Sequence, residues 1–263
     1  MTTTIALAGK GGVGKTTVCG MIIKYLAQNQ SGAILAIDAD PSSNLNMVLG
    51  LELDITVGDI REDMLAQVKN SLLGSGAAMG ALPGGITKHE YLDHQIRSSL
   101  AEGQAFDLIA MGRGEGTGCY CAVNHNLREV VDAISKNYRY VVIDNEAGME
   151  HLSRRTTRDV QHLIIVSDPT QRGIVAAKRI AELSREFDVR IENVYLVINR
   201  LTGEIPPALL AYIEANLDVP LLGTIPSDST LMDFEFSGRP LVELGDQSQV
   251  YQAVDRMMRK ILT

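Results

Sequence analysis

The 263-residue chain contains no tryptophan, and aromatic residues make up only 5% of it. Proteins that bind single-stranded nucleic acid stack bases on aromatic side chains, so this scarcity argues against such a platform. Positive charge is also in short supply, because 24 Lys and Arg stand against 32 Asp and Glu, which gives a formal net charge of −8. A surface that coats nucleic acid needs clustered Lys and Arg. We therefore expect no nucleic-acid partner.

Long apolar runs and a signal peptide are missing as well. No apolar stretch approaches the roughly 18 residues of a membrane-spanning helix, and the first residues lead directly into an apolar segment. We therefore expect a cytoplasmic protein without a membrane partner. Three cysteines in such a chain do not indicate a disulfide scaffold and favour metal or redox use. The length suits one large domain over residues 1–263.

Apolar runs rich in β-forming residues alternate with segments of helical spacing along the chain. This alternation predicts an α/β fold with a mostly parallel central sheet flanked by helices on both faces. Strands are expected at Thr3–Ala8, Ala33–Ile37, Asp107–Ala110, Tyr140–Ile143, His162–Val166, Val194–Ile198 and Leu221–Thr224. Helices are expected at Thr16–Gln28, Val57–Lys69, Tyr91–Leu100, Asn126–Asn137, Thr170–Phe187, Pro207–Leu217 and Gln247–Leu262. Ligands of such folds bind beyond the carboxyl ends of the strands.

A phosphate-binding loop (P-loop) lies between the first strand and the first helix. Residues 9–17 read Gly-Lys-Gly-Gly-Val-Gly-Lys-Thr-Thr, which satisfies the pattern G-x-x-x-x-G-K-[ST]. Glycines let backbone N–H groups converge on phosphate oxygens, and the helix N-terminus adds partial positive charge. Lys15 should reach the β- and γ-phosphates, and Thr16 should hold Mg²⁺. The nucleotide-binding residues predicted here are Gly11, Gly12, Val13, Gly14, Lys15, Thr16 and Thr17.

Lys10 distinguishes this loop from an ordinary P-loop, which needs no lysine at its second position. A cation there contacts a nucleotide only by pointing away from its own loop, toward a second protomer. The run 9–17 resembles the deviant Walker A loop of the nitrogenase iron protein, arsenite pump ATPase, MinD and ParA group. In that group the lysine reaches across a homodimer to the partner's nucleotide, and the resemblance implies the same role for Lys10.

Two aspartates follow the second predicted strand. Asp38 and Asp40 stand two residues apart, so both carboxylates face the same way, toward the expected γ-phosphate and Mg²⁺. Their D-x-D-P-x-x-N segment resembles switch I of the same group, which implies that Asp40 orients the attacking water and that Asp38 supports the Mg²⁺ shell. Phosphoryl transfer needs positioning and charge neutralisation more than a strong base. Lys10, Lys15 and Asp40 are the predicted catalytic residues.

Later segments complete the predicted nucleotide site. Asp144 ends an apolar strand, as in a Walker B segment, and should bind a water molecule on Mg²⁺. Gly148 should offer a backbone N–H to the γ-phosphate and move with hydrolysis. Asn199 ends another strand and can donate and accept toward adenine, and Pro226 should line the same pocket. Since no N-K-x-D motif is present, the residues alone leave GTP open, whereas the resemblance implies ATP.

Cys119 and Cys121 follow a glycine-rich run that starts at Gly112. In extended chain the two thiols project to one side, where they can chelate a soft or borderline metal ion but cannot form an unstrained disulfide. One pair supplies half of a four-ligand shell, and a two-fold dimer supplies all of it. Nickel, structural zinc and a bridging [4Fe–4S] cluster all fit this pattern. Cys19, on the apolar face of the first helix, is expected in the core.

Four segments together make the chain resemble the CooC-type ATPases, which insert nickel into carbon monoxide dehydrogenase. They are Ala8–Thr17, Asp38–Pro41, Cys119–Cys121 and Ala147–Leu152. The resemblance implies a homodimer that binds Ni²⁺ or Zn²⁺ through both cysteine pairs. It also implies that ATP hydrolysis is coupled to delivery of the metal to a client nickel enzyme, with carbon monoxide dehydrogenase as the expected client.

Two other functions stay open at this point. A positioning ATPase like MinD or ParA would need a membrane-binding helix or a basic DNA-binding surface. The amphipathic stretch Val250–Leu262 is the candidate for such a helix, although we expect it to be the last helix of the core. An electron-transfer ATPase would carry a bridging iron–sulfur cluster on the cysteine pair.

Overall fold

The computed structural model describes residues 2–73, 87–113, 121–147, 159–186 and 189–262. The strands are β1 (Thr3–Gly9), β2 (Ile34–Asp38), β3 (Ala101–Glu102), β4 (Asp107–Ala110), β5 (Tyr140–Asp144), β6 (Asp159–Ser167), β7 (Arg190–Leu201) and β8 (Leu221–Pro226). The helices are α1 (Lys15–Asn29), α2 (Leu45–Leu49), α3 (Val57–Leu73), α4 (Lys88–Ser98), α5 (Cys121–Ser135), α6 (Gln171–Ser184), α7 (Pro207–Asn216), α8 (Ser229–Phe236) and α9 (Gln249–Ile261), with the short 3₁₀ helix η2 (Leu241–Glu243).

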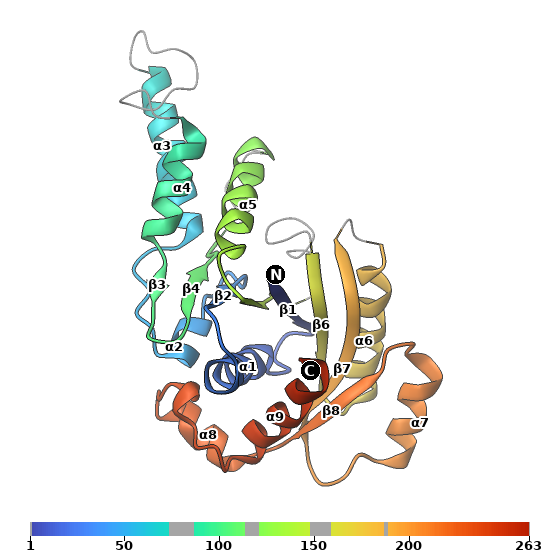
Figure 1. Cartoon of the computed structure of the whole chain (residues 1–263). Coiled ribbons are helices and arrows are strands. Elements are labelled where there is room, and N and C mark those ends of the chain that lie inside the picture. Colours follow the sequence, from blue (N-terminus) through green and yellow to red (C-terminus); the bar gives the residue numbers. More distant parts are fainter. Residues whose placement is uncertain (1, 74–86, 114–120, 148–158, 187–188, 263) are drawn as a thin grey trace.

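The strands form one eight-stranded sheet with the order β3-β4-β2-β5-β1-β6-β7-β8 (Figure 1). The pairing of β3 with β4 is antiparallel, whereas the other pairings are parallel. The α/β fold with a mostly parallel, helix-flanked sheet that the sequence predicts is therefore confirmed. β1 lies between β5 and β6, so the P-loop leaves the sheet near its centre.

Successive side chains of β1 enter two separate cores, because a strand projects neighbouring residues to opposite faces. Ala6 and Ala8 join a cluster with residues of α3, α4, α5 and α6. Ile5 and Leu7 join a second cluster with residues of α1, α2 and α9. Helices thus cover both faces of the central strands, which explains why these strands are continuous apolar runs in the sequence.

The helix α9 completes the second core. Its Val250, Val254, Met257 and Met258 are at most 3% exposed, and the helix packs on α1 and β8. The expectation that the stretch Val250–Leu262 belongs to the last helix of the core is therefore confirmed, with the helix ending at Ile261. Within the described ranges, no helix combines the length and apolar character needed to cross a membrane.

The helix that follows the glycine-rich run begins earlier than expected. α5 starts at Cys121, whereas the sequence pattern predicts a start at Asn126. The expectation of extended chain at Cys121 is therefore wrong, because this residue opens a helix. The first turn is itself apolar, with Cys121, Ala122 and Val123, but it directly follows the glycine-rich run, which the sequence pattern assigns to extended chain. The predicted start at Asn126 rests on the apolar spacing from Leu127 onward, where Leu127 and Val130 are buried. Cys119 lies outside the described residues.

Two short helices of the structure, α2 and α8, have no counterpart among the predicted elements. α2 has five residues, and its first backbone N–H, that of Leu45, is bound by the Asp38 carboxylate. α8 buries none of its residues, so it lacks the hydrophobic periodicity by which a surface helix is recognised. Both helices therefore depend on tertiary contacts, and the sequence pattern does not reveal them.

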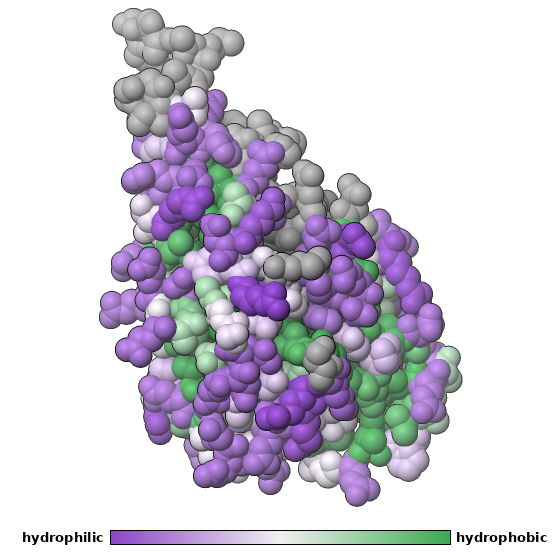
Figure 2. Space-filling view, viewed as in Figure 1, coloured by the Kyte–Doolittle hydropathy of each residue, from purple (hydrophilic) through white to green (hydrophobic). Residues whose placement is uncertain are grey.

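The helices α3 and α4 pack against each other and extend away from the sheet (Figure 1). The base of α3 is fixed to the end of β4, because the Gly58 N–H donates to the Met111 carbonyl at 2.9 Å. A Cβ on Gly58 would collide with the Arg113 carbonyl oxygen, so glycine permits this close approach. Figure 2 shows mainly hydrophilic side chains on this pair of helices, and an apolar patch near α7, where Leu209 and Leu210 are half-buried.

Candidate functional site

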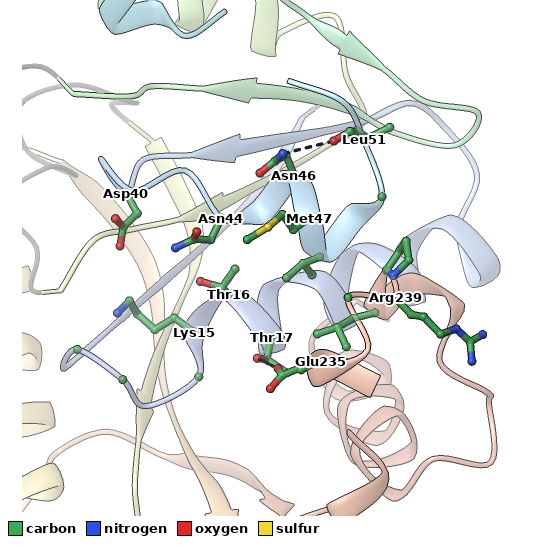
Figure 3. A pocket seen from close by; sticks show the side chains of 18 of the residues that line it. Lys15, Thr16, Thr17, Asp40, Asn44, Asn46, Met47, Leu51, Glu235 and Arg239 are labelled. Atoms are coloured by element: carbon green, nitrogen blue, oxygen red, sulfur yellow. Dashed lines mark hydrogen bonds between the residues drawn. The ribbon is translucent and has the colours of Figure 1, made fainter. Parts of the chain in front are cut away.

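A cavity of about 750 Å³ opens beside the P-loop. At one end it is bordered by the P-loop, the start of α1 and the loop after β2, with Lys15, Thr16, Asp40 and Asn44 around it (Figure 3). Glu146 and Arg200 also line this end, and the cavity continues between α2 and α8 past Asn46, Met47, Glu235 and Arg239. The predicted P-loop and switch I residues are thus brought together at one opening.

The backbone of the P-loop has the shape that anion binding requires. Gly12 and Gly14 adopt φ angles of 77° and 88°, which L side chains rarely tolerate. Gly14 is the N-cap residue of α1, and no side chain of the described residues caps this helix end. The first N–H groups of α1 are thus left for an anion, which the helix dipole also favours. The Lys15 ammonium donates to the Lys10 carbonyl at 3.4 Å across the loop.

Asp38 organises the segment that follows β2. Its carboxylate accepts the backbone N–H of Asp40 at 3.0 Å and that of Leu45 at 2.9 Å, which fixes the loop between them. Asp40 in turn accepts both the N–H and the hydroxyl of Ser42 on its Oδ1, at 2.9 and 2.5 Å. This Asx turn uses only the Oδ1 atom of Asp40, so the Oδ2 atom is left for other partners. The role of Asp40 in activating water stays a prediction.

The residues predicted to hold Mg²⁺ fit such an ion. Asp144 is 1% exposed, and its Oδ1 has no hydrogen-bond partner among the described residues. Burial raises the pKa of Asp144 to about 7, opposed by a hydrogen bond from the Thr16 hydroxyl. Burial likewise raises the pKa of Asp38 to about 6. A divalent cation would satisfy the orphaned oxygen and stabilise both carboxylates in their charged form.

Asn199 lies beneath the P-loop. Its amide nitrogen donates to the Val13 carbonyl at 2.8 Å, and its amide oxygen accepts the Arg200 N–H at 2.9 Å. The predicted contact of this side chain with adenine stays a prediction, because the amide is engaged with protein in this state. Pro226, the last residue of β8, pairs with Leu201 at the end of β7.

Other predicted residues are placed in different ways. Lys10 is exposed, and its contact with a second protomer stays a prediction. Val13 is 2% exposed, so only its backbone is placed to contact a nucleotide. Gly148 and Cys119 lie outside the described residues. Cys19 is fully buried, and burial raises its pKa. Within the described ranges, no three His, Cys, Asp or Glu side chains group as metal ligands.

Two further cavity residues, Arg200 and Glu235, have no predicted role. The Arg200 guanidinium donates to the Gly12 carbonyl at 2.8 Å. The Glu235 carboxylate accepts the Thr17 hydroxyl at 2.9 Å, although the two residues are 218 positions apart. Long-range contacts of this kind leave no local motif, and only the position of Arg200 directly after Asn199 could have directed attention to it.

The sequence of the chain is similar to those of known nucleotide-binding proteins. Residues 4–241 match the family model of the CobQ/CobB/MinD/ParA nucleotide binding domain. An uncharacterized ATP-binding protein of Methanocaldococcus jannaschii is 41% identical over 258 residues, which is 98% of each chain. The carbon monoxide dehydrogenase accessory protein CooC of Rhodospirillum rubrum is 28% identical over 243 residues, 91% of this chain and 89% of that protein.

A solved structure has the same fold. The septum site-determining protein MinD complexed with Mg-ADP from Pyrococcus horikoshii OT3 matches with a TM-score of 0.69 at 21% identity, and the match covers 99% of this chain and 96% of that one. The likeness concerns the arrangement of the sheet and its helices.

Proposed function

The chain belongs to the CobQ/CobB/MinD/ParA family of nucleotide-binding ATPases, and on this premise we propose that it couples ATP hydrolysis to the delivery of a metal ion. The cargo is Ni²⁺ or Zn²⁺, held by Cys119 and Cys121 of two subunits. The client is a nickel enzyme, with carbon monoxide dehydrogenase as the first candidate. Both the resemblance of the sequence segments and the similarity to CooC support this choice.

The nucleotide part of the proposal follows from the cavity. The P-loop N–H groups and the Lys15 ammonium bind the β- and γ-phosphates, and Asp40 orients the water that attacks the γ-phosphorus. Thr16 and Asp144 would hold Mg²⁺, which supplies charge neutralisation on the phosphate oxygens when bound. Asn199 and Pro226 are the residues proposed to contact the base, and Gly148 is the proposed switch II donor.

One contact supports the proposed coupling between the nucleotide site and the metal site. The Met111 N–H donates to the Asp38 carbonyl at 2.7 Å, where β4 and β2 end side by side. The chain proceeds from Met111 through the glycine-rich run to the cysteine pair, and Cys121 opens α5. A shift of the Asp38–Asp40 segment on nucleotide binding would therefore act directly on the start of the cysteine-bearing segment. Transfer requires that the metal affinity differs between nucleotide states.

The test is an anaerobic nickel titration of the whole protein with a non-hydrolysable ATP analogue and with ADP. We expect one Ni²⁺ for two chains in one nucleotide state and weaker binding in the other. Cys121→Ala should abolish stoichiometric binding, whereas Cys19→Ala, which removes a thiol that is fully buried in α1, should retain it. Full nickel binding by the Cys121→Ala variant would refute the proposal.

A positioning ATPase is the second candidate, because the family and the MinD fold allow it. The apolar face of α9 is occupied by contacts with α1 and β8, so a membrane-binding role would require this helix to leave the core. Co-sedimentation with liposomes or plasmid DNA in the presence of ATP tests this candidate. A visible spectrum of anaerobically purified protein tests the third one, the electron-transfer ATPase, because a bridging iron–sulfur cluster absorbs there.

A further inference from the structure

The end of β7 departs from regular strand geometry where it meets the P-loop. Ile198 stands opposite Thr224, and Leu201 stands opposite Pro226, so three steps along β7 match two along β8. One extra residue in a strand is a β-bulge. Within it, Arg200 has a φ of 59°, in the left-handed region that residues other than glycine rarely adopt. Strain of this kind persists where the surroundings enforce it, often at functional sites.

The bulge has a consequence for the side chains of Asn199 and Arg200. Consecutive residues of a regular strand project to opposite faces, yet these two both reach the P-loop. The Asn199 amide donates to the Val13 carbonyl and the Arg200 guanidinium donates to the Gly12 carbonyl, each at 2.8 Å. Two consecutive residues of β7 therefore hold two consecutive carbonyl groups of the loop.

These two bonds fix the orientation of peptide groups that a phosphate would contact. With both carbonyls bound toward β7, the loop cannot turn either of them toward the phosphate site, where a carbonyl oxygen would repel the anion. The approach is close, because a Cβ on Gly14 would lie 2.5 Å from the Asn199 amide nitrogen. The positive φ angles of Gly12 and Gly14 complete the concave arrangement of N–H groups that binds anions.

We propose that Arg200 is a positioning residue for nucleotide binding, which together with Asn199 holds the P-loop in its binding shape before the nucleotide arrives. The apparent affinity of a site falls in proportion to the fraction of molecules that are competent to bind. Loss of the guanidinium would release the Gly12 carbonyl and lower that fraction. This assignment concerns nucleotide binding alone and does not depend on the metal.

The substitution Arg200→Gly separates positioning from folding, since glycine adopts a φ of 59° without strain. We expect the variant to bind Mg-ADP and a non-hydrolysable ATP analogue about tenfold more weakly, by the same factor for both, because the competent fraction falls equally for each ligand. Its melting temperature should equal or exceed that of the wild type. Calorimetric titration and thermal unfolding of the full chain measure these quantities. Arg259→Ala, which removes an exposed guanidinium from α9, should bind both ligands as the wild type does.

Two further measurements complete the test. Millimolar guanidinium should restore part of the lost affinity of Arg200→Gly, and Arg200→Lys, which keeps one N–H donor, should lie between the glycine variant and the wild type. Unchanged ADP affinity of Arg200→Gly would overturn the assignment. A loss confined to the ATP analogue would make Arg200 a direct ligand of the γ-phosphate, and a lower melting temperature would make its role structural. Either result would also overturn the assignment.

Discussion

At the scale of single residues, the buried carboxylates of Asp38 and Asp144, which are expected to serve Mg²⁺ binding, lower the stability of the nucleotide-free protein. Both side chains are 1% exposed, and burial raises their pKa values to about 6 and about 7. The folded state therefore holds protons that the unfolded state has released between about pH 4 and pH 7. Because the folded state binds more protons, the stability of the nucleotide-free protein falls as the pH rises through this range.

The substitution Asp144→Asn removes the charge without changing the shape of the side chain. At pH 8, without Mg²⁺ or nucleotide, we expect the variant to be more stable than the wild type by up to about 4 kcal/mol, and the difference should shrink toward pH 5. Urea denaturation at the two pH values measures the free energy of unfolding. Asp218→Asn, at a side chain that is 95% exposed, should change it little. A less stable Asp144→Asn variant at pH 8 would show that the charge is well solvated in the fold.

The site residues that could be predicted lie in local sequence motifs, whereas those that could not depend on contacts between distant parts of the chain. The P-loop and the two aspartates lie within short motifs, and the structure gathers Lys15, Thr16 and Asp40 at one cavity. Arg200 acts through a left-handed φ angle and Glu235 through a contact with a residue 218 positions away. Neither feature has a local pattern, since each arises only once the chain has folded.

At the scale of elements, the buried Lys24 joins α1 to the C-terminal part of the chain. Its ammonium donates to the Leu244 carbonyl, pairs with Asp246 at 3.0 Å and lies 4.8 Å from the ring centre of Tyr251. The Lys24 side chain is only 6% exposed, whereas that of Asp246 is 64% exposed. The lysine is thus a buried charge whose partners come from the segment between η2 and α9 and from α9 itself.

Lys24→Met keeps most of the apolar stem and removes the charge. We expect a loss of about 1–3 kcal/mol in the free energy of unfolding, because the buried Leu244 carbonyl is left without its donor. Denaturant titration of both proteins measures it. The pair of the exposed Arg259 with Asp255 provides the comparison, since Arg259→Ala should change the free energy of unfolding little. A stability of Lys24→Met equal to that of the wild type would mean that the methionine packing offsets the lost hydrogen bond.

The helix α8 contributes a negative charge to the nucleotide cavity. Glu235 accepts the hydroxyl of Thr17, a predicted phosphate ligand, so its carboxylate stands where a nucleotide would approach. α8 has no fully buried residue, because Leu231 and Phe234 pack only partly buried against the second core and the last residue, Phe236, is 96% exposed. Nucleotide binding should therefore break the Thr17–Glu235 contact and shift α8.

Glu235→Gln keeps a hydrogen-bond acceptor and removes the repulsion of phosphate. We expect about fivefold tighter binding of ADP, which corresponds to the roughly 1 kcal/mol of two charges about 4 Å apart in water. Titration at low and high salt measures the effect, which should diminish as ionic strength rises. Glu243→Gln, at an exposed carboxylate paired with Arg239, serves as the matched control. Weaker ADP binding by Glu235→Gln would mean that the carboxylate assists the nucleotide.

Elements could be predicted where hydrophobic periodicity was strong. The central strands and α9 have buried faces and lie near their predicted positions, whereas α2 and α8 depend on a carboxylate cap or on surface contacts. The start of α5 differs from the predicted one because Cys121–Val123, although apolar, directly follow the glycine-rich run that favours extended chain. The sheet order is likewise a tertiary property, because the sequence indicates parallel strands but not which strands are neighbours.

At the scale of the whole molecule, the position of Lys10 leads to a prediction about assembly. Its side chain is exposed at the P-loop, and only its backbone carbonyl takes part in the contact with Lys15. We expect the protein with nickel and a non-hydrolysable ATP analogue to sediment as a homodimer. The Lys10→Ala variant should remain a single subunit under the same conditions while binding ADP as the wild type does. If the wild-type protein stays a single subunit, this result would contradict the prediction that Lys10 reaches across a homodimer to the partner's nucleotide.

The two-residue strand β3 limits the association of copies of this chain through the edge of the sheet. It runs against β4 at one border of an otherwise parallel sheet, and so short a strand offers few open backbone groups to a neighbouring molecule. In concentrated solution, growth of fibrils by strand addition at that border should thus be suppressed.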